Sequence, residues 1–278
     1  MKIGQDIVKN LGMGTWYLGE GNNIRSDQEI NALQYGINRG INVIDTAEMY
    51  GDGAAEQLVG RAITQYDRSS LFLISKFYPW HADKDNMKAS LTASLQRLGT
   101  DYLDLYLLHW PGDTPIEETL SALHGLQQDG LIKQFGVSNF DVRDLNAASA
   151  NHYFEDISAN EILYNVATRG TEYDLLPYHR THNIATIAYS PFGSGNGNEI
   201  QIPSIISQLA HDKKVTIHQL ILSWILRQNN ILAIPKASSV DHIQNNIDAM
   251  NIEWSPDELS IIDTAFPAPN HKEPLKVI

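Results

Sequence analysis

Short apolar runs alternate with helical patterns along almost the whole chain. The runs are LGMGTW, INVID, LFLISK, LDLYLLH, QFGVSN, ISANEILY, ATIAYS and ILAIPK, at residues 11–16, 41–45, 71–76, 103–109, 134–139, 157–164, 185–190 and 231–236. Most are about 30 residues apart, which is the βα repeat length of a (β/α)₈ barrel. Between them, apolar residues recur at helical spacing, as at Leu91, Leu95 and Leu98. The pattern therefore predicts a TIM barrel that spans residues 1–278 as one α/β domain.

Further features are predicted at two helix starts and at the two ends of the chain. SDQE at Ser26–Glu29 and SPDE at Ser255–Glu258 match the capping box, so each predicts the start of a helix. We expect a short hairpin at the N-terminus. The Pro-rich stretch AFPAPNHKEPLKVI, residues 265–278, predicts a non-helical loop that lies over the barrel mouth.

Most of the apolar runs end on a polar residue or contain one near the end. These residues are Asp45, Lys76, His109, Asn139, Glu161, Ser190 and Lys236. Strands have to end somewhere, and a single polar residue at a strand end means little. Acid, base, imidazole and amide groups at seven such ends together indicate a reaction site, because the carboxyl ends of barrel strands share one face.

Composition excludes several classes of function. The chain has 278 residues, 42% of them apolar, no cysteine and a net charge of −13. The acidic balance disfavours non-specific binding to nucleic acid or to an anionic membrane. Without cysteine there is no disulfide and no cysteine-ligated metal, which favours a reducing cytosol. The N-terminus MKIGQDIVKN has no long apolar run, so we expect a cytoplasmic protein, and we expect a monomer.

Asp45, Tyr50, Lys76 and His109 come from neighbouring strands and form a candidate catalytic tetrad. A free tyrosine has a pKa of about 10, and a nearby ammonium lowers that pKa. Asp45 supplies the opposite charge that a buried lysine needs. His109 is suited to orient a carbonyl oxygen through a hydrogen bond. No side chain is an evident nucleophile, so we expect a hydride from a cofactor to attack the carbonyl carbon.

These residues lie in motifs that resemble the aldo-keto reductase family. The motifs are GMGTW, DTAEMYGDGAAEQLVG, LDLYLLHWP, GVSNF, AYSPFG and IPKASS, which begin at residues 12, 45, 103, 136, 188 and 234. The resemblance covers essentially the whole chain. Within the family, LISKFYPW, GTEYDLLP and AFPAP make the chain most similar to short bacterial members that reduce methylglyoxal.

The resemblance implies a role for each site residue. Tyr50 is expected to be the general acid, activated by Lys76 and Asp45, with His109 orienting the substrate carbonyl. Tyr189 is expected to stack on the nicotinamide, and Lys236 to take the 2′-phosphate of NADP(H). The expected cofactor residues are Gly14, Thr15, Trp16, Asp45, Ser138, Asn139, Glu161, Tyr189, Ser190, Pro191, Phe192, Gly193, Ser194, Lys236, Ala237, Ser238, His242, Asn245 and Asn246. The expected substrate pocket consists of Trp16, Tyr50, Phe77, Trp80, His109 and Trp110.

Three positions depart from the commonest pattern of the family. Glu161 stands where many members have glutamine, Ala237 where serine is frequent, and His242 where arginine usually lies over the adenine and the 2′-phosphate. A neutral histidine offers neither the fixed charge nor the planar fork of arginine. We therefore expect NADPH as the cofactor because of Lys236, with NADH accepted at a weaker preference.

The loop after His109, WPGDTPIEE, passes almost directly into the next helix and predicts an open mouth that tolerates small aldehydes. The sequence thus predicts an NADPH-dependent reductase of small aldehydes or ketones, with 2-oxoaldehydes such as methylglyoxal as the best candidates. One alternative is a nicotinamide-binding regulatory subunit with little turnover. A second is a metal-dependent barrel hydrolase or lyase, but the remaining histidines are scattered and predict no metal site.

Overall fold

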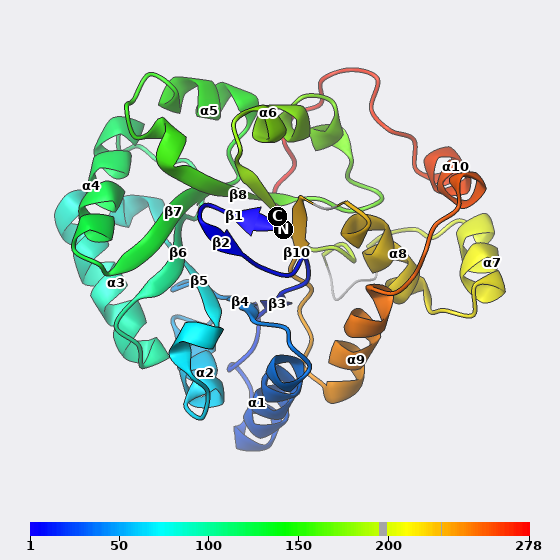
Figure 1. Ribbon diagram of the computed structural model, residues 1–278, viewed down its shortest axis with the longest axis horizontal. Helices are drawn as coiled ribbons and strands as arrows, with labels where there is room; N and C mark the ends of the chain where they lie inside the picture. Colours follow the sequence, from blue (N-terminus) through cyan, green and yellow to red (C-terminus); the bar gives the residue numbers. More distant parts are fainter. Residues whose placement is uncertain (195–198, 229) are drawn as a thin grey trace.

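Eight parallel strands form the centre of the molecule, in the order β10-β9-β8-β7-β6-β5-β4-β3. The computed structural model describes residues 1–194, 199–228 and 230–278. Backbone hydrogen bonds close the sheet on itself, from Gly12 N to Ala233 O (2.8 Å) and from Ala233 N to Asn10 O (2.9 Å). Helices surround the strands (Figure 1), so the predicted (β/α)₈ barrel is confirmed.

The elements follow one another in the predicted alternation. The strands are β1 Lys2–Ile3, β2 Asp6–Ile7, β3 Met13–Gly14, β4 Val43–Asp45, β5 Phe72–Phe77, β6 Leu103–Leu108, β7 Ile132–Ser138, β8 Ile157–Leu163, β9 Ala185–Tyr189 and β10 Ile231–Ala233. The helices are α1 Asn23–Asn38, α2 Ala54–Ile63, α3 Lys84–Leu98, α4 Ile116–Gln128, α5 Val142–Ala148, α6 Leu175–Thr181, α7 Ser204–Asp212, α8 Ile217–Leu226, α9 Val240–Ala249 and α10 Pro256–Ala265. Among the described residues no helix is long and apolar enough to cross a membrane.

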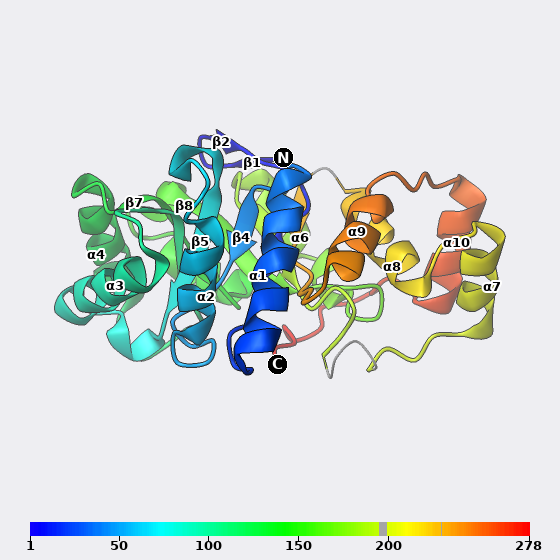
Figure 2. The same ribbon diagram turned by 90° about the horizontal axis from the view of Figure 1, so that it is seen from below.

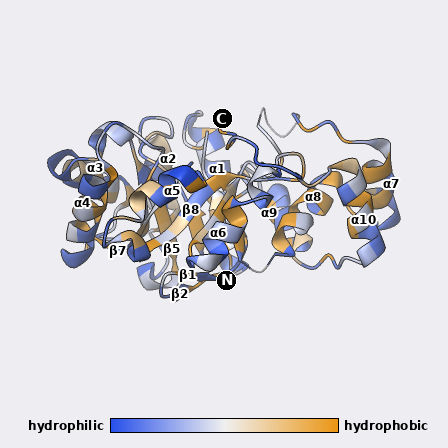
Figure 3. Cartoon of the chain, turned by 90° about the horizontal axis from the view of Figure 1, so that it is seen from above, coloured by the Kyte–Doolittle hydropathy of each residue, from blue (hydrophilic) through white to orange (hydrophobic). Residues whose placement is uncertain are grey.

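Side chains alternate between two apolar layers along each strand. On β5, Ile74 joins the cluster inside the barrel, while Leu73 and Phe77 join the cluster between the strands and the helices. This alternation follows from the two-residue repeat of a strand. Figure 3 shows hydrophobic residues concentrated on strands such as β5 and β8, with hydrophilic residues on the outer sides of α3 and α4.

The two ends of the chain lie on opposite faces of the barrel (Figure 2). β1 and β2 pair antiparallel as the predicted hairpin, and Ile3 packs into the inner cluster, which closes the N-terminal face. The tail after α10 crosses the other face. Lys272 Nζ pairs there with Asp141 (2.5 Å) and Asp174 (3.0 Å), and Ile278 reaches the central cavity. The predicted loop over the mouth is confirmed.

The two predicted capping boxes have different outcomes. Ser255 and Glu258 form the predicted box at the start of α10, with Pro256 at its first turn. The prediction for SDQE is wrong, because α1 begins a turn earlier, where Asn22 caps it through the N–H of Arg25. Glu29 is buried within α1 and instead accepts a hydrogen bond from Gly19 N at 2.9 Å. The helix therefore anchors the loop after β3.

Candidate active site

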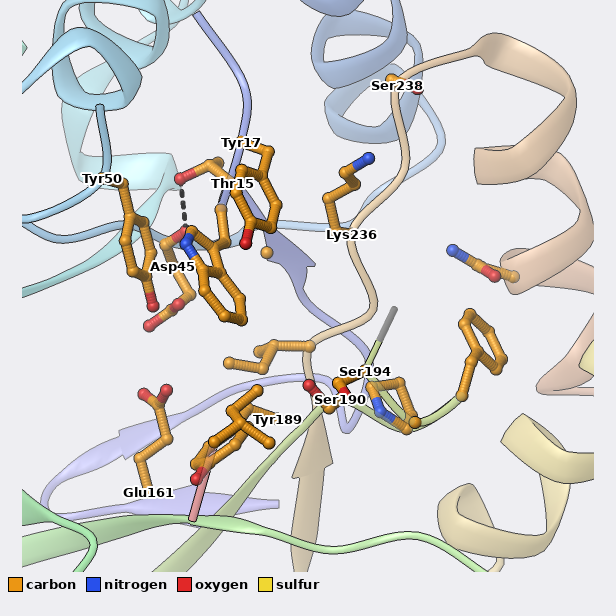
Figure 4. Close-up of a pocket in the computed structure, with 18 of the residues that line it drawn as sticks. Thr15, Tyr17, Asp45, Tyr50, Glu161, Tyr189, Ser190, Ser194, Lys236 and Ser238 are labelled. Atoms are coloured by element: carbon orange, nitrogen blue, oxygen red, sulfur yellow. Dashed lines mark hydrogen bonds between the residues drawn. The ribbon is translucent and has the colours of Figure 1, made fainter. Parts of the chain in front are cut away.

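A cavity of about 560 Å³ lies at the C-terminal ends of the strands, where the sequence predicts the site. The predicted strand-end residues that line it are Asp45, His109, Asn139, Glu161, Ser190 and Lys236. Lys76 lies behind Asp45 and is fully buried. Figure 4 shows that Asp45, Tyr50 and Glu161 point toward one another, while Lys236 and Ser238 lie on the segment that leads into α9. The cavity thus has an acidic end and a basic end.

Lys76 is the centre of the acidic end. Its Nζ lies 2.8 Å from both carboxylate oxygens of Asp45, 3.1 Å from the hydroxyl of Tyr50 and 3.4 Å from Glu161 Oε1. Burial disfavours the charged ammonium, but the negative charge around it, above all that of Asp45, outweighs burial and raises the pKa of Lys76 above its usual range. Lys76 therefore stays charged and donates to its neighbours.

Tyr50 sits in the turn between β4 and α2, where its backbone N–H donates to Ala47 O (3.1 Å). Burial raises the pKa of its hydroxyl, and the Lys76 ammonium opposes the rise without cancelling it. Lys76 therefore acts on the pKa of Tyr50 in the expected direction, but its effect is smaller than that of burial. Tyr50 carries its proton at neutral pH, and Lys76 is placed to stabilise the phenolate once that proton has left.

His109 follows β6 and faces the same end of the cavity. Its ring centroid lies 5.8 Å from that of Tyr50, and its Nδ1 is buried without a partner among the described residues. Burial, together with the charge of Lys76, lowers the pKa of His109 to about 3. The imidazole is therefore neutral, and it can orient a carbonyl oxygen with one N–H but cannot supply a proton at neutral pH.

Asn139, at the end of β7, is held by its neighbours. It has a left-handed backbone conformation (φ 60°), which asparagine tolerates. Its amide donates to His109 O at 3.1 Å and accepts from the hydroxyl of Tyr189 at 2.8 Å. Ser138 Oγ donates to Glu161 O at 3.0 Å. These bonds link β6, β7, β8 and β9 and fix the amide at the floor of the cavity.

Glu161 is buried on β8 and is incompletely paired. Its Oε1 has Lys76 at 3.4 Å, while its Oε2 has no hydrogen-bond partner among the described residues. Burial raises the pKa of its carboxyl well above the usual range, and the charge of Asp45 adds to that rise. Of the two states open to Glu161, this environment favours the protonated one. The free oxygen is available to a ligand in the cavity.

The basic end of the cavity lies at the start of α9. Lys236 is half-buried there and makes no hydrogen bond or ion pair with any described residue. Ser239 caps α9 by accepting from His242 N at 3.3 Å, and His242 lines the cavity. A free ammonium beside a helix N-terminus suits an anion such as a phosphate. The Ala237 side chain packs into the core and does not line the cavity.

The predicted aromatic pocket is present in part. Trp16 and Trp110 line the cavity, and Trp16 stacks on Tyr50 with ring centroids 6.2 Å apart. Trp80 is 60% exposed and reaches the cavity only through Trp110, 5.9 Å away. The predicted pocket position of Phe77 is wrong, because Phe77 follows Lys76 on β5 and so faces the helices.

The remaining predicted cofactor residues also border the cavity. They are Gly14, Thr15, Ser138, Tyr189, Pro191, Phe192, Gly193, Ser194, Asn245 and Asn246. Six lining residues were missed, namely Tyr17, Met49, Thr216, His218, Ile234 and Ile278. The sequence held a signal for one of the six, Thr216, since Thr216 and Gln219 form a capping box at the start of α8.

The sequence did not mark Glu48 as a structural residue of the site, although it lies within the motif that contains Asp45 and Tyr50. It is buried and accepts from Tyr78 N (2.6 Å) and Ser90 Oγ (2.6 Å), and it lies 2.9 Å from His81 Nδ1. It thereby anchors the segment that carries Trp80. Among the described residues, no three histidine, aspartate or glutamate side chains lie where they could hold one metal ion.

Comparison with known proteins decides the family. The sequence model described as the Aldo/keto reductase family matches residues 10–266. The chain belongs to the aldo/keto reductase family. This confirms the resemblance and identifies the protein as an enzyme of an NAD(P)H-dependent oxidoreductase family.

Individual members of the aldo/keto reductase family are similar over almost their whole length. Methylglyoxal reductase YeaE of Escherichia coli is 40% identical over 270 residues, which cover 96% of this chain and 94% of that protein. An NADH-specific methylglyoxal reductase of the same organism is 28% identical and covers 89% and 91%. An aldo/keto reductase of Klebsiella pneumoniae, solved with NADP and acetate, has a TM-score of 0.94 and 42% identity over 99% and 97%.

The cavity of this aldo/keto reductase fits a nicotinamide dinucleotide by its own donors and acceptors. The unpaired Oε2 of Glu161 can accept from a carboxamide NH₂, and the aromatic ring of Tyr189 borders the same end. At the other end, the unpaired Lys236 matches a phosphate. The unpaired oxygen of Glu161 and the unpaired ammonium of Lys236 lie at opposite ends of one cavity, as an elongated ligand requires.

Proposed function

We propose that the protein uses NADPH to reduce small aldehydes, above all 2-oxoaldehydes such as methylglyoxal. The observation that carries the proposal is the contact of Lys76 with both Asp45 and the hydroxyl of Tyr50, beside a neutral His109. The bacterial methylglyoxal reductases among its relatives support the substrate class. The aromatic rim of Trp16 and Trp110 suits a small carbonyl compound.

Bound NADPH supplies the hydride, and the residues of the chain direct it. His109 donates a hydrogen bond to the carbonyl oxygen and thereby positions the carbon. Tyr50 then gives its proton to that oxygen, and Lys76, held by Asp45, stabilises the negative charge left on Tyr50. Tyr189 and Asn139 border the place of the nicotinamide ring, and their hydrogen bond holds both in position.

Lys236 is the expected reader of the 2′-phosphate. A charge-assisted contact of this kind contributes roughly 1.5–3 kcal/mol. We therefore expect Lys236→Ala to weaken NADPH binding by about 10- to 150-fold and to leave NADH binding little changed. Fluorescence titration with both cofactors measures the change.

The control for Lys236→Ala is Lys88→Ala, which removes an equal charge on α3, where Lys88 pairs with Asp129 at the surface. Lys88→Ala should change neither affinity. Equal losses for NADPH and NADH in Lys236→Ala would show that Lys236 does not contact the 2′-phosphate.

His109→Ala should lower kcat/KM for every aldehyde tested by about 10²–10³-fold, the usual effect of losing one fixed donor. Because the pKa of His109 is lowered to about 3, its charge does not change between pH 5 and pH 8. We therefore expect wild type and His109→Gln, which keeps an N–H donor, to have pH profiles of the same shape in that range. A step near pH 6.5 in the wild type alone would contradict a neutral His109.

A nicotinamide-binding regulatory subunit is the remaining alternative. It would bind NADPH as well as the reductase does but would oxidise little of it. A steady-state screen of NADPH and NADH oxidation against a panel of small aldehydes tests this. Repeated turnover with methylglyoxal would support the reductase, whereas binding without turnover on any aldehyde would favour the regulatory subunit.

A further inference from the structure

The acidic end of the cavity holds two carboxyl groups but a single cation. Asp45, Glu161 and Lys76 are each at most 2% exposed. With both acids ionised the cluster would carry a net charge of −1 away from water, which is costly. One proton shared by the two acids makes the cluster neutral.

The geometry decides which acid keeps that proton. Asp45 has the Lys76 ammonium 2.8 Å from both of its oxygens, which favours its ionised form. Glu161 has Lys76 at 3.4 Å on one oxygen and no partner on the other. The proton therefore resides on Glu161.

The other titratable groups around Glu161 do not compete for this proton. Tyr50, from the turn after β4, and Tyr189, from β9, have pKa values raised by burial and stay neutral. His109, after β6, has a lowered pKa and also stays neutral. At neutral pH, Glu161 is thus the group of this cluster whose charge can change.

We propose that Glu161 is the proton reservoir of the reduction: it is protonated beside the neutral reduced nicotinamide and ionised beside the positive oxidised one. The proposal rests on the proposed function, which places the nicotinamide next to Glu161. In either state the charges of Asp45, Lys76, Glu161 and the nicotinamide ring sum to zero. The ring gains a positive charge on oxidation, and Glu161 gains a negative charge when it loses its proton. A glutamine at this position could accept from the carboxamide but could not give up a proton.

The proton path uses contacts already described. The carbonyl carbon gains the hydride, and the carbonyl oxygen takes the proton of Tyr50. Lys76, 3.1 Å away, returns a proton to the Tyr50 oxygen, and Glu161, 3.4 Å from Lys76, returns one to Lys76. Overall, one C–H bond and one O–H bond form on the substrate, while a C–H bond of the reduced nicotinamide and the O–H bond of Glu161 break. The electron pair comes from the reduced nicotinamide.

Proton counting on binding tests the proposal without turnover. Titration calorimetry of NADP⁺ and of NADPH at pH 7, each in two buffers of different ionisation enthalpy, gives the protons exchanged per cofactor bound. We expect NADP⁺ to release close to one proton more than NADPH. The 2′-phosphate is common to both cofactors, so its own titration cancels in the difference. Glu161→Gln should abolish the difference.

Glu56→Gln is the matched control, because Glu56 is a fully buried acid on α2 whose charge is satisfied by Arg97 at 2.6 Å. It should leave the difference in proton release intact. Equal proton release for both cofactors in the wild type would overturn the proposal, and so would a difference that persists in Glu161→Gln.

A second measurement needs only the wild type, in case Glu161→Gln does not fold. If Glu161 loses its proton in the oxidised complex alone, the ratio of the NADP⁺ to the NADPH dissociation constant falls as pH rises, by up to about tenfold per pH unit. A ratio independent of pH from 5 to 8 would overturn the reservoir. Absence of cofactor binding, or of aldehyde reduction by bound NADPH, would instead overturn the proposed function.

Discussion

Tyr50→Phe should lower kcat for aldehyde reduction by about 10²–10⁴-fold, the usual contribution of a general acid. The substitution removes one oxygen and keeps the ring, so the stacking on Trp16 and the fold of the turn remain. Lys76 keeps Asp45 and Thr46 O as acceptors, the latter at 3.1 Å. NADPH binding should therefore stay nearly unchanged, as measured by fluorescence titration beside steady-state kinetics with methylglyoxal.

Tyr66→Phe is the matched control for Tyr50→Phe. It removes the same atom from a tyrosine whose hydroxyl donates to Gln34 O on α1, far from the cavity. Its kcat should equal that of the wild type. If Tyr50→Phe kept more than about a tenth of the wild-type kcat, Tyr50 would not be the general acid.

The strand ends of the site could be predicted from the sequence because polar residues directly follow apolar ones there. An apolar run that stops at a charged or amide residue, as at Asp45 or Lys236, identifies both a buried strand and the polar end of that strand. The barrel then brings these ends together, since parallel strands share one carboxyl edge. The alternation of side chains could also have assigned Phe77 to the helix side, given that Lys76 faces inward.

Other features of the site depend on contacts between segments far apart in the chain, which a short sequence pattern does not reveal. The raised pKa of Tyr50 results from burial by segments remote in sequence, which outweighs the ammonium beside it. The SDQE pattern cannot show that Asn22 caps α1 or that Glu29 binds the loop after β3. The approach of Ile278 to the cavity depends on where the tail crosses the barrel face.

Lys76→Met should destabilise the protein strongly, by about 3–5 kcal/mol at pH 8, because it leaves two buried acids without their cation. Asp45 and Glu161 can then avoid a buried charge only by staying protonated, so burial raises the pKa of both well above their unfolded values of about 3.9 and 4.3. A raised folded-state pKa contributes stability at low pH that is lost as the pH rises through it. The destabilisation should therefore be smaller at pH 5 than at pH 8, as measured by urea unfolding without cofactor.

The double variant Lys76→Met/Asp45→Asn separates this electrostatic cause from a simple loss of packing. It removes one of the two acids, so no pair of buried acids is left without a cation. At pH 8 it should be more stable than Lys76→Met, although it lacks another member of the tetrad and should not recover activity. If the two variants were equally destabilised at both pH values, the lost lysine chain rather than the unpaired carboxyl groups would account for the effect. Recovery of stability without activity would show that the Lys76–Asp45 ion pair has two separate roles. It supports Tyr50 as the general acid, and it neutralises the charge that would otherwise be buried in the site.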